Sequence, residues 1–233
     1  MTVCEVRSPT EDERRFHLSG GLQRFVVMEL AFSEGKLGGH LWDGGILMTA
    51  WAMSVKELEN ERVLELGSGV GLLGISLASR AASVVLSDFD ANEVEPSDAE
   101  RLVPTRLLAN LKENVDRNGV KNAEVWHIDW YDSLAGKEPR EQFRRLVAAD
   151  VVYYSADVPA LAAAIGAHLC PKGVGFIFVP RRQWRGPLAA ERASAEDLAA
   201  ALADYGTVEV HELLGYCCTL EETPVALIRI QRT

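Results

Sequence analysis

The sequence predicts an α/β fold: a doubly wound, mostly parallel seven-strand sheet, preceded by an N-terminal β-hairpin. Three observations predict it. Short apolar runs alternate with helical patterns along the chain, which is typical of a parallel sheet with helices on both faces. One run, residues 63–66, leads through a glycine-rich turn directly into an apolar helix pattern. The last two runs follow each other without a helical pattern, which predicts a final antiparallel hairpin.

In chain order, residues 1–14 are polar and charged and predict a loose extension. Residues 15–18 and 23–30 flank a Gly20-Gly21 turn and predict the hairpin. Apolar residues at helical spacing predict a helix over 42–58. The predicted strands of the main sheet are 63–66, 84–87, 123–127, 146–149, 175–179, 208–213 and 224–230, and the predicted helices between them are 72–80, 102–118, 158–169 and 195–204. Residues 91–101 are acidic and predict a surface loop or short helix, with an acidic lip for a basic substrate as the alternative.

Length and composition indicate one domain with an extension. The chain has 233 residues, of which 48% are apolar and 25% charged, as in ordinary soluble globular proteins. We expect residues 1–37 to form the extension and 38–233 the main domain. No segment approaches the ~20 apolar residues of a membrane span, and the first residues lack the apolar stretch of a signal peptide. The four cysteines lack metal-ligand spacing, which predicts no metal site and a cytoplasmic protein, with the nucleus as the alternative.

The net charge of −10 bears on the partners. Nucleic acids bind to basic surfaces, so the charge disfavours a nucleic-acid substrate. An acidic surface attracts a basic protein segment or a cationic small molecule instead. The sequence carries no indication of oligomeric state.

The glycine-rich turn after residues 63–66 fits two patterns. From Gly69 it gives the dinucleotide-binding spacing Gly-x-Gly-x-x-Gly, with Asp88 about 20 residues on as the ribose partner. From Gly67 it gives Glu-Leu-Gly-x-Gly-x-Gly, continuing through Gly71, which is the pattern of enzymes that bind S-adenosyl-L-methionine. A turn whose glycines serve packing alone is the plain alternative.

Two details favour the S-adenosyl-L-methionine pattern. The apolar strand runs straight into Gly67, so the turn begins there. Glu65 lies in the strand end, where a carboxylate is costly without a cationic partner such as the amino group of a bound methionine. Asp88 ends the next strand, where it would accept hydrogen bonds from both ribose hydroxyls. The predicted cofactor is therefore S-adenosyl-L-methionine, with S-adenosyl-L-homocysteine as its product.

Two further groups of residues lie where such a cofactor needs contacts. Trp42, just before the predicted helix 42–58, is placed to cover the cofactor, or else is a core anchor. Asp129 and Trp130 follow the third strand, where an acid and an aromatic ring suit the adenine amino group and ring face. The alternative is that Trp130 serves packing.

The end of the fourth strand carries the candidate acceptor site. Ligands bind at the carboxyl ends of strands in such sheets. Small Ala149 leaves room for the cofactor, Asp150 falls near the reactive methyl group, and Tyr153 walls the channel for the acceptor. A strand-to-helix turn with Asp150 as a helix cap is the alternative.

Taken in order, the motifs of the chain read Gly38-x-x-x-Trp42-Asp43, Glu65-Leu-Gly67-x-Gly69-x-Gly71-Leu-x-Gly74, Asp88, Asn114…Asn118, Asp129-Trp130 and Asp150-Val-Val-Tyr153. Together they resemble methyltransferase family 16, the seven-strand protein lysine methyltransferases that act mainly on non-histone proteins. The resemblance runs over residues 38–169 and implies a class I, Rossmann-like methyltransferase fold. The acidic stretch 91–101 is longer than the family's usual link, and the region from Gly173 matches little.

The resemblance also implies roles for individual residues. Asp150 and Tyr153 would line the acceptor site as catalytic residues, Asp150 by binding and orienting the acceptor and Tyr153 by offering its ring face and hydroxyl. The cofactor contacts that the resemblance implies are Trp42, Gly67, Gly69, Asp88, Trp130 and Ala149. The motifs themselves add Glu65, Gly71 and Asp129 to the predicted contacts. The implied activity is methyl transfer to a lysine side chain of a protein, through a basic segment. The alternatives are another acceptor (arginine, histidine or a small amine), a cofactor-binding interaction module with weak catalysis, or an NAD-dependent dehydrogenase.

Overall fold

The structure is a computed structural model that describes residues 3–7, 13–18, 24–89, 106–182, 191–216 and 222–233. The predicted acidic segment 91–101 and the adjacent Cys217 and Cys218 lie outside these residues. Among the described residues, no helix has the length and apolar character needed to span a membrane. No cluster of three or more potential metal ligands occurs in the same ranges.

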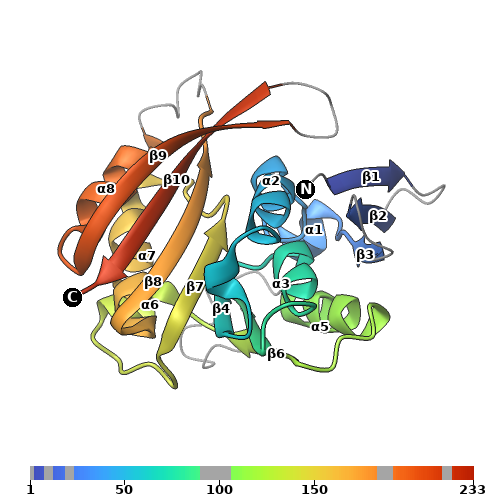
Figure 1. Cartoon of the computed structure of the whole chain (residues 1–233), viewed down its shortest axis with the longest axis horizontal. Helices are drawn as coiled ribbons and strands as arrows, with labels where there is room; N and C mark the ends of the chain where they lie inside the picture. Colours follow the sequence, from blue (N-terminus) through green and yellow to red (C-terminus); the bar gives the residue numbers. More distant parts are fainter. Residues whose placement is uncertain (1–2, 8–12, 19–23, 90–105, 183–190, 217–221) are drawn as a thin grey trace.

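The main sheet has seven strands in the order β6-β5-β4-β7-β8-β10-β9 (Figure 1). The strands are β4 (Arg62–Leu66), β5 (Ser83–Asp88), β6 (Ala123–His127), β7 (Phe143–Ala149), β8 (Leu169–Pro180), β9 (Gly206–Tyr216) and β10 (Glu222–Arg232). The strands from β6 to β8 pair in parallel. Strand β10 is antiparallel to both β8 and β9, which confirms the predicted final hairpin.

Helices cover both faces of this sheet. In Figure 1, α2 (Asp43–Ala52), α3 (Leu72–Leu77) and α5 (Leu107–Arg117) lie on one side, and α6 (Trp130–Leu134), α7 (Val158–His168) and α8 (Ala195–Leu202) lie on the other. Two buried apolar clusters follow the same division, since Val63 of β4 belongs to one and its neighbour Leu64 to the other. A strand buried on both faces reads as a continuous apolar run, and this confirms the doubly wound prediction.

A separate three-stranded antiparallel sheet precedes the main sheet. Its strands are β1 (Val3–Arg7), β2 (Glu13–Leu18) and β3 (Arg24–Met28), in that order. The predicted hairpin corresponds to β2 and β3, which pair as expected. The prediction of a loose extension over 1–14 was wrong, because β1 pairs with β2 over its whole length. The predicted boundary at residues 37 and 38 stays a prediction.

Asparagine side chains at α5 form hydrogen bonds with the backbone of β3. Asn118 accepts a hydrogen bond from the Val26 N–H (2.9 Å), and Asn114 accepts one from the Met28 N–H (2.9 Å). The spacing of four on the helix matches the spacing of two on the strand, so both side chains reach the free edge of β3. Asn114 also donates to the Val70 carbonyl (3.0 Å) in the glycine-rich turn. One helix therefore connects the N-terminal sheet to that turn.

Several element boundaries differ from prediction. The helix predicted over 42–58 ends at Ala52, where the Ser54 hydroxyl donates to the Trp51 carbonyl, and a short 3-10 helix follows at Lys56–Leu58. The five-residue α6 and the four-residue α1 (Phe32–Gly35) were not predicted, because one helical turn carries almost no periodicity.

Candidate functional site

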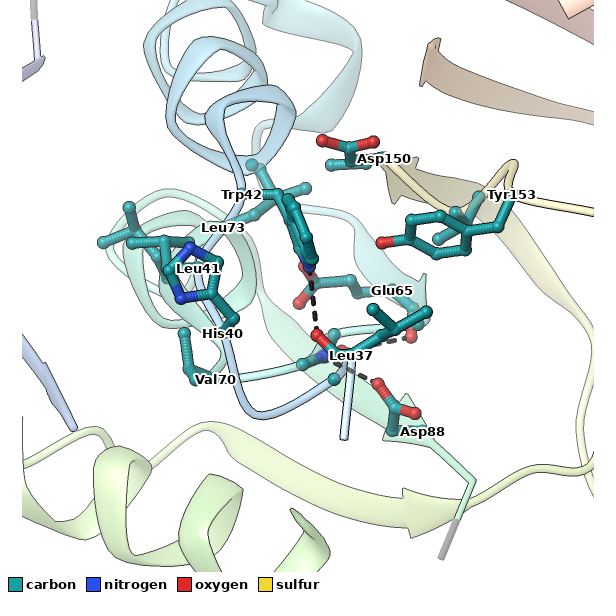
Figure 2. A pocket seen from close by; sticks show the side chains of 18 of the residues that line it. Leu37, His40, Leu41, Trp42, Glu65, Val70, Leu73, Asp88, Asp150 and Tyr153 are labelled. Carbon is teal, nitrogen blue, oxygen red and sulfur yellow. Dashed lines mark hydrogen bonds between the residues drawn. The ribbon is translucent and has the colours of Figure 1, made fainter. Parts of the chain in front are cut away.

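A pocket lies at the carboxyl ends of β4, β5 and β7, beneath the segment 37–42 (Figure 2). It has about 660 Å³ of empty space, part of it open to solvent. Predicted site residues that line it are Trp42, Glu65, Gly67, Gly69, Asp88, Trp130, Ala149, Asp150 and Tyr153. The fold thus brings together residues from five separate segments.

The glycine-rich turn needs its glycines for two reasons. Gly67, Gly69 and Gly71 have φ values of 66°, 54° and 90°, in the left-handed region that favours glycine. A Cβ on Gly67 would lie 2.6 Å from Val151 Cγ1, so the backbone itself forms the pocket wall. Gly71 does not line the pocket. It begins α3, and a Cβ there would lie 2.4 Å from Leu111 Cδ1.

The Asp88 carboxylate is held against this turn. Its Oδ2 accepts a hydrogen bond from the Gly69 N–H (2.7 Å), and its Oδ1 accepts one from the Phe89 N–H (2.8 Å). Figure 2 shows the Gly69 bond, with Asp88 at the opposite end of the pocket from Asp150. The acid predicted to receive a ribose is therefore fixed in orientation at the end of β5.

Glu65 is the most unusual group in the pocket. It is 2% exposed, and its Oε2 has no hydrogen-bond partner within the described part of the chain. Burial raises the pKa of the carboxyl group to about 8. A Cβ on Gly74 would lie 2.4 Å from Oε2, so the glycine there is required by the carboxyl group. A buried carboxyl oxygen without a partner in the pocket lining fits a cationic ligand group, such as the amino group of a bound methionine.

The segment 37–42 is anchored over the pocket by its own contacts. The Trp42 indole N–H donates to the Leu37 carbonyl (3.0 Å), and the His40 ring packs edge-on against Trp42, with 5.0 Å between ring centroids. Glu29 accepts a hydrogen bond from the Leu41 N–H (2.6 Å). Trp42 is therefore held in place as a wall of the pocket.

Tyr153 faces Trp42 across the pocket, with 6.3 Å between the ring centroids. Its hydroxyl points inward in Figure 2. Burial, and then the charge of Asp150, raise the pKa of Tyr153 well above its usual range. The phenol therefore stays neutral and serves as a hydrogen-bonding group.

Asp150 is held in a strained backbone conformation. Its φ of 59° lies in the left-handed region, which a non-glycine residue adopts only when its surroundings hold it there. Its Oδ2 accepts a hydrogen bond from the Gly44 N–H (3.3 Å) at the start of α2. Both carboxylate oxygens also accept from the guanidinium of Arg182.

Sequence reasoning missed Arg182. It lies two residues after β8, and its guanidinium also lies 5.5 Å from the centroid of the Trp42 ring. Burial lowers the pKa of Arg182, but its hydrogen bonds and charge interaction with Asp150 outweigh this and raise it. No motif marks this residue. The one available signal was a basic side chain at the carboxyl end of the strand beside β7.

Asp129 and Trp130 separate in the structure. Trp130 lines the pocket, but Asp129 does not and instead caps α6, where it accepts a hydrogen bond from the Tyr131 N–H (2.9 Å). The predicted adenine contacts of both residues stay predictions. Within the described ranges, the two residues absent from the pocket lining among those predicted are thus Asp129 and Gly71.

The chain resembles known proteins in sequence and in fold. A family model described as lysine methyltransferase matches residues 27–186. The protein N-lysine methyltransferase METTL21A of Danio rerio is 30% identical over 122 residues, which are 52% of this chain and 50% of that protein. The METTL21A of Xenopus tropicalis is 26% identical over 159 residues, which are 66% of this chain and 67% of that protein. The match to the first of these relatives thus spans only half of its length.

Among solved structures, the N-methyltransferase NodS from Bradyrhizobium japonicum WM9, in complex with S-adenosyl-L-homocysteine, superposes with a TM-score of 0.55. It is 17% identical and covers 78% of this chain and 83% of its own, so the likeness is one of fold. The expected class I, Rossmann-like methyltransferase fold is confirmed. Because the family model covers more than half of the sequence, the chain belongs to methyltransferase family 16, the lysine methyltransferases.

Proposed function

We propose that the protein is an S-adenosyl-L-methionine-dependent methyltransferase that modifies a lysine side chain of another protein. The observation that carries this proposal is the unpartnered Oε2 of Glu65, buried in the pocket beside a turn of left-handed glycines. The names of the METTL21A relatives, both protein N-lysine methyltransferases, support the choice of acceptor.

The residues of the pocket fit this cofactor in its separate parts. Glu65 would receive the methionine amino group, Gly67 and Gly69 would let the backbone approach closely, and Asp88 would receive the ribose hydroxyls. Trp130 would contact the adenine ring. When bound, S-adenosyl-L-methionine supplies the methyl group, since the new N–C bond forms from the lone pair of the acceptor nitrogen as the S–C bond breaks.

The opposite end of the pocket would receive the acceptor. Trp42 and Tyr153 lie there with 6.3 Å between their ring centroids and their planes tilted by 59°, and the two rings would border the amine, since a ring face attracts a cation. The neutral Tyr153 hydroxyl would accept or donate one hydrogen bond to the nitrogen. A lysine, with a usual pKa of about 10.4, reacts only after it loses a proton. Partial desolvation between the two rings would favour that loss.

The partner we propose is a protein with a basic segment around the target lysine. The support is the net charge of −10, which attracts a basic chain and raises its rate of encounter. The extent of methylation would depend on how many methyl groups fit between Trp42 and Tyr153.

The test has two parts. Isothermal titration with S-adenosyl-L-homocysteine is expected to show one site, with binding lost or strongly weakened in Gly67→Ala. A cell extract incubated with methyl-labelled S-adenosyl-L-methionine and the protein is expected to show a discrete labelled protein band. Asp150→Ala, in protein that still binds S-adenosyl-L-homocysteine, is expected to lower this labelling at least about tenfold. Binding without a labelled protein would point to a small-molecule acceptor or an interaction module, and tighter binding of NAD would support a dehydrogenase.

A further inference from the structure

We propose that Arg182 is a positioning residue of the acceptor site, and that an ion pair of Asp150 with Arg182, rather than a free Asp150 carboxylate, adjoins the acceptor amine. This inference rests on the proposed function. It revises the expectation from sequence that Asp150 binds the amine of the acceptor directly.

Both carboxylate oxygens of Asp150 already accept hydrogen bonds within the protein. The two Nη atoms of Arg182 donate to the two carboxylate oxygens in parallel, one at 2.5 Å, and the Gly44 N–H donates to Oδ2 (3.3 Å). Such two-point pairing fixes the carboxylate in direction as well as in distance. The Asp150 side chain is only 2% exposed, so the carboxylate is enclosed by the protein together with its partner Arg182.

The close packing around Asp150 indicates that Arg182 does not leave easily. A Cβ on Gly44 would lie 2.7 Å from Asp150 Cβ and 2.9 Å from Pro180 Cγ, so α2, β7 and the end of β8 meet with no spare space. Asp150 is also held at a φ of 59°. Removing Arg182 would leave a buried carboxylate unpaired in a strained backbone, which is costly.

The charges around the pair favour a neutral acceptor. The guanidinium lies 5.5 Å from the centroid of the Trp42 ring, which is one wall of the acceptor site. The other groups that act on Arg182 are Asp43 on α2 and Tyr153, while Arg181 and Arg192 line the neighbouring hollow with it. Arg181 is itself paired with Glu196 and Glu212. Because Arg182 pairs with Asp150, the charge of Asp150 does less to hold the proton on the acceptor than a free carboxylate would.

The experiment compares Arg182→Met and Arg182→Lys with Arg181→Met. Arg181 is the matched control, because it is the adjacent arginine and pairs with two exposed glutamates instead of Asp150. Labelling of the extract protein is measured against pH, and affinity for S-adenosyl-L-homocysteine is measured by calorimetry. Arg182→Met is expected to bind S-adenosyl-L-homocysteine within about threefold of the unmodified protein, yet to label at least about tenfold more slowly near neutral pH.

The pH profile separates positioning from a structural role. With Arg182 removed, the unpaired carboxylate of Asp150 would stabilise the acceptor ammonium. The pH at which the labelling rate rises should therefore increase by about one unit. Arg182→Lys keeps the charge without the two-point geometry and should fall between the two, whereas Arg181→Met should match the unmodified protein. Labelling by Arg182→Met at or above the unmodified rate, or an unshifted profile, would overturn the proposal.

A second measurement needs no acceptor and distinguishes this inference from the proposed function. Arg182→Met and Asp150→Asn should each lower the unfolding temperature of the ligand-free protein. The double variant should unfold at a higher temperature than the sum of the two losses predicts, because it leaves no unpaired charge. Losses of unfolding temperature that simply add in the double variant would refute an ion pair between Asp150 and Arg182. If the unmodified protein labels no protein band, the proposed function fails, whatever this comparison shows.

Discussion

At the scale of single residues, the pocket places groups where folding alone would not retain them. Glu65 is buried without a partner for Oε2, and Asp150 is held in a left-handed conformation. Each costs stability in the ligand-free protein. Such groups persist where ligand binding offsets the cost. Substitution of either residue should therefore raise the stability of the ligand-free protein or lower its function.

The pKa of Glu65 gives a prediction about pH. The folded pKa is about 8, above the ordinary value of 4.5. The stability that this group confers is complete below about pH 4.5 and is lost as the pH rises through 8, because the unfolded chain releases the proton first. Glu65→Gln removes this loss. The stability advantage of Glu65→Gln over the unmodified protein should therefore grow by about 2–4 kcal/mol of unfolding free energy as the pH rises from about 5.5 to 8.5.

Denaturant unfolding at several pH values checks this gain, with exposed Glu113→Gln as the control that should show none. The same Glu65→Gln protein should bind S-adenosyl-L-homocysteine more weakly. A difference in unfolding free energy that stays constant over this pH range would contradict the raised pKa of Glu65.

The positions of site residues were predictable where a strand end marked them. Glu65, Asp88 and Asp150 each end an apolar run, and the carboxyl ends of neighbouring parallel strands meet at one edge. Asp129 obeys the same rule, yet its carboxylate caps α6, since a helix that sequence reasoning did not predict begins directly after it. Arg182 could not be predicted, because its partner lies 32 residues away and no local pattern records an ion pair.

At the scale of elements, Gly67 in the glycine-rich turn can be compared with Gly119, which lies outside it. Gly67 and Gly119 have nearly equal φ values, 66° and 67°, but a Cβ on Gly119 would meet no atom within 4 Å. Gly119→Ala should therefore cost only the left-handed backbone, about 1 kcal/mol. Gly67→Ala adds the contact with Val151 and should cost about 2–4 kcal/mol in all.

Thermal unfolding and calorimetry of the two alanine variants test this difference. Affinity for S-adenosyl-L-homocysteine should fall for Gly67→Ala alone. Equal losses of stability, with affinity unchanged in both, would show that the turn does not approach a ligand.

The asparagines of α5 give a second comparison between elements. Asn114 hydrogen-bonds both β3 and the Val70 carbonyl of the glycine-rich turn, whereas Asn118 bonds β3 and its own helix. Asn114→Ala should lower the free energy of unfolding by about 2–3 kcal/mol, because buried backbone groups lose their partners. It should also weaken the binding of S-adenosyl-L-homocysteine. Asn118→Ala should lower stability and leave affinity unchanged. Chemical unfolding with calorimetry checks both, and equal affinities in the two variants would contradict a link from β3 to the turn.

At the scale of the whole molecule, the net charge of −10 leads to a prediction about salt. If a basic segment is steered to the protein, labelling of the acceptor should slow several-fold between about 50 and 300 mM salt, because screening shortens the reach of the charges. Binding of S-adenosyl-L-homocysteine, which has no net charge, should change little and serves as the control. Salt-independent labelling would exclude electrostatic recruitment of a basic segment.

The overall architecture was predictable because strands buried on both faces appear as apolar runs. The seven strands fall at the predicted places, and the last two pair antiparallel as predicted. What failed depends on long-range pairing. Strand β1 lies in a polar stretch and exists through its pairing with β2, and β8 begins at Leu169, six residues before its predicted start, beside β7. Neither partner is visible in the local sequence.

The most direct test of the proposed function is the identity of the methylated residue. The labelled protein band is hydrolysed in acid, and the labelled amino acid is separated by chromatography beside standards. We expect Nε-methylated lysine, formed by the unmodified protein and formed at least about tenfold more slowly by Arg182→Met. Label recovered as methylarginine, methylhistidine or a small molecule would contradict it.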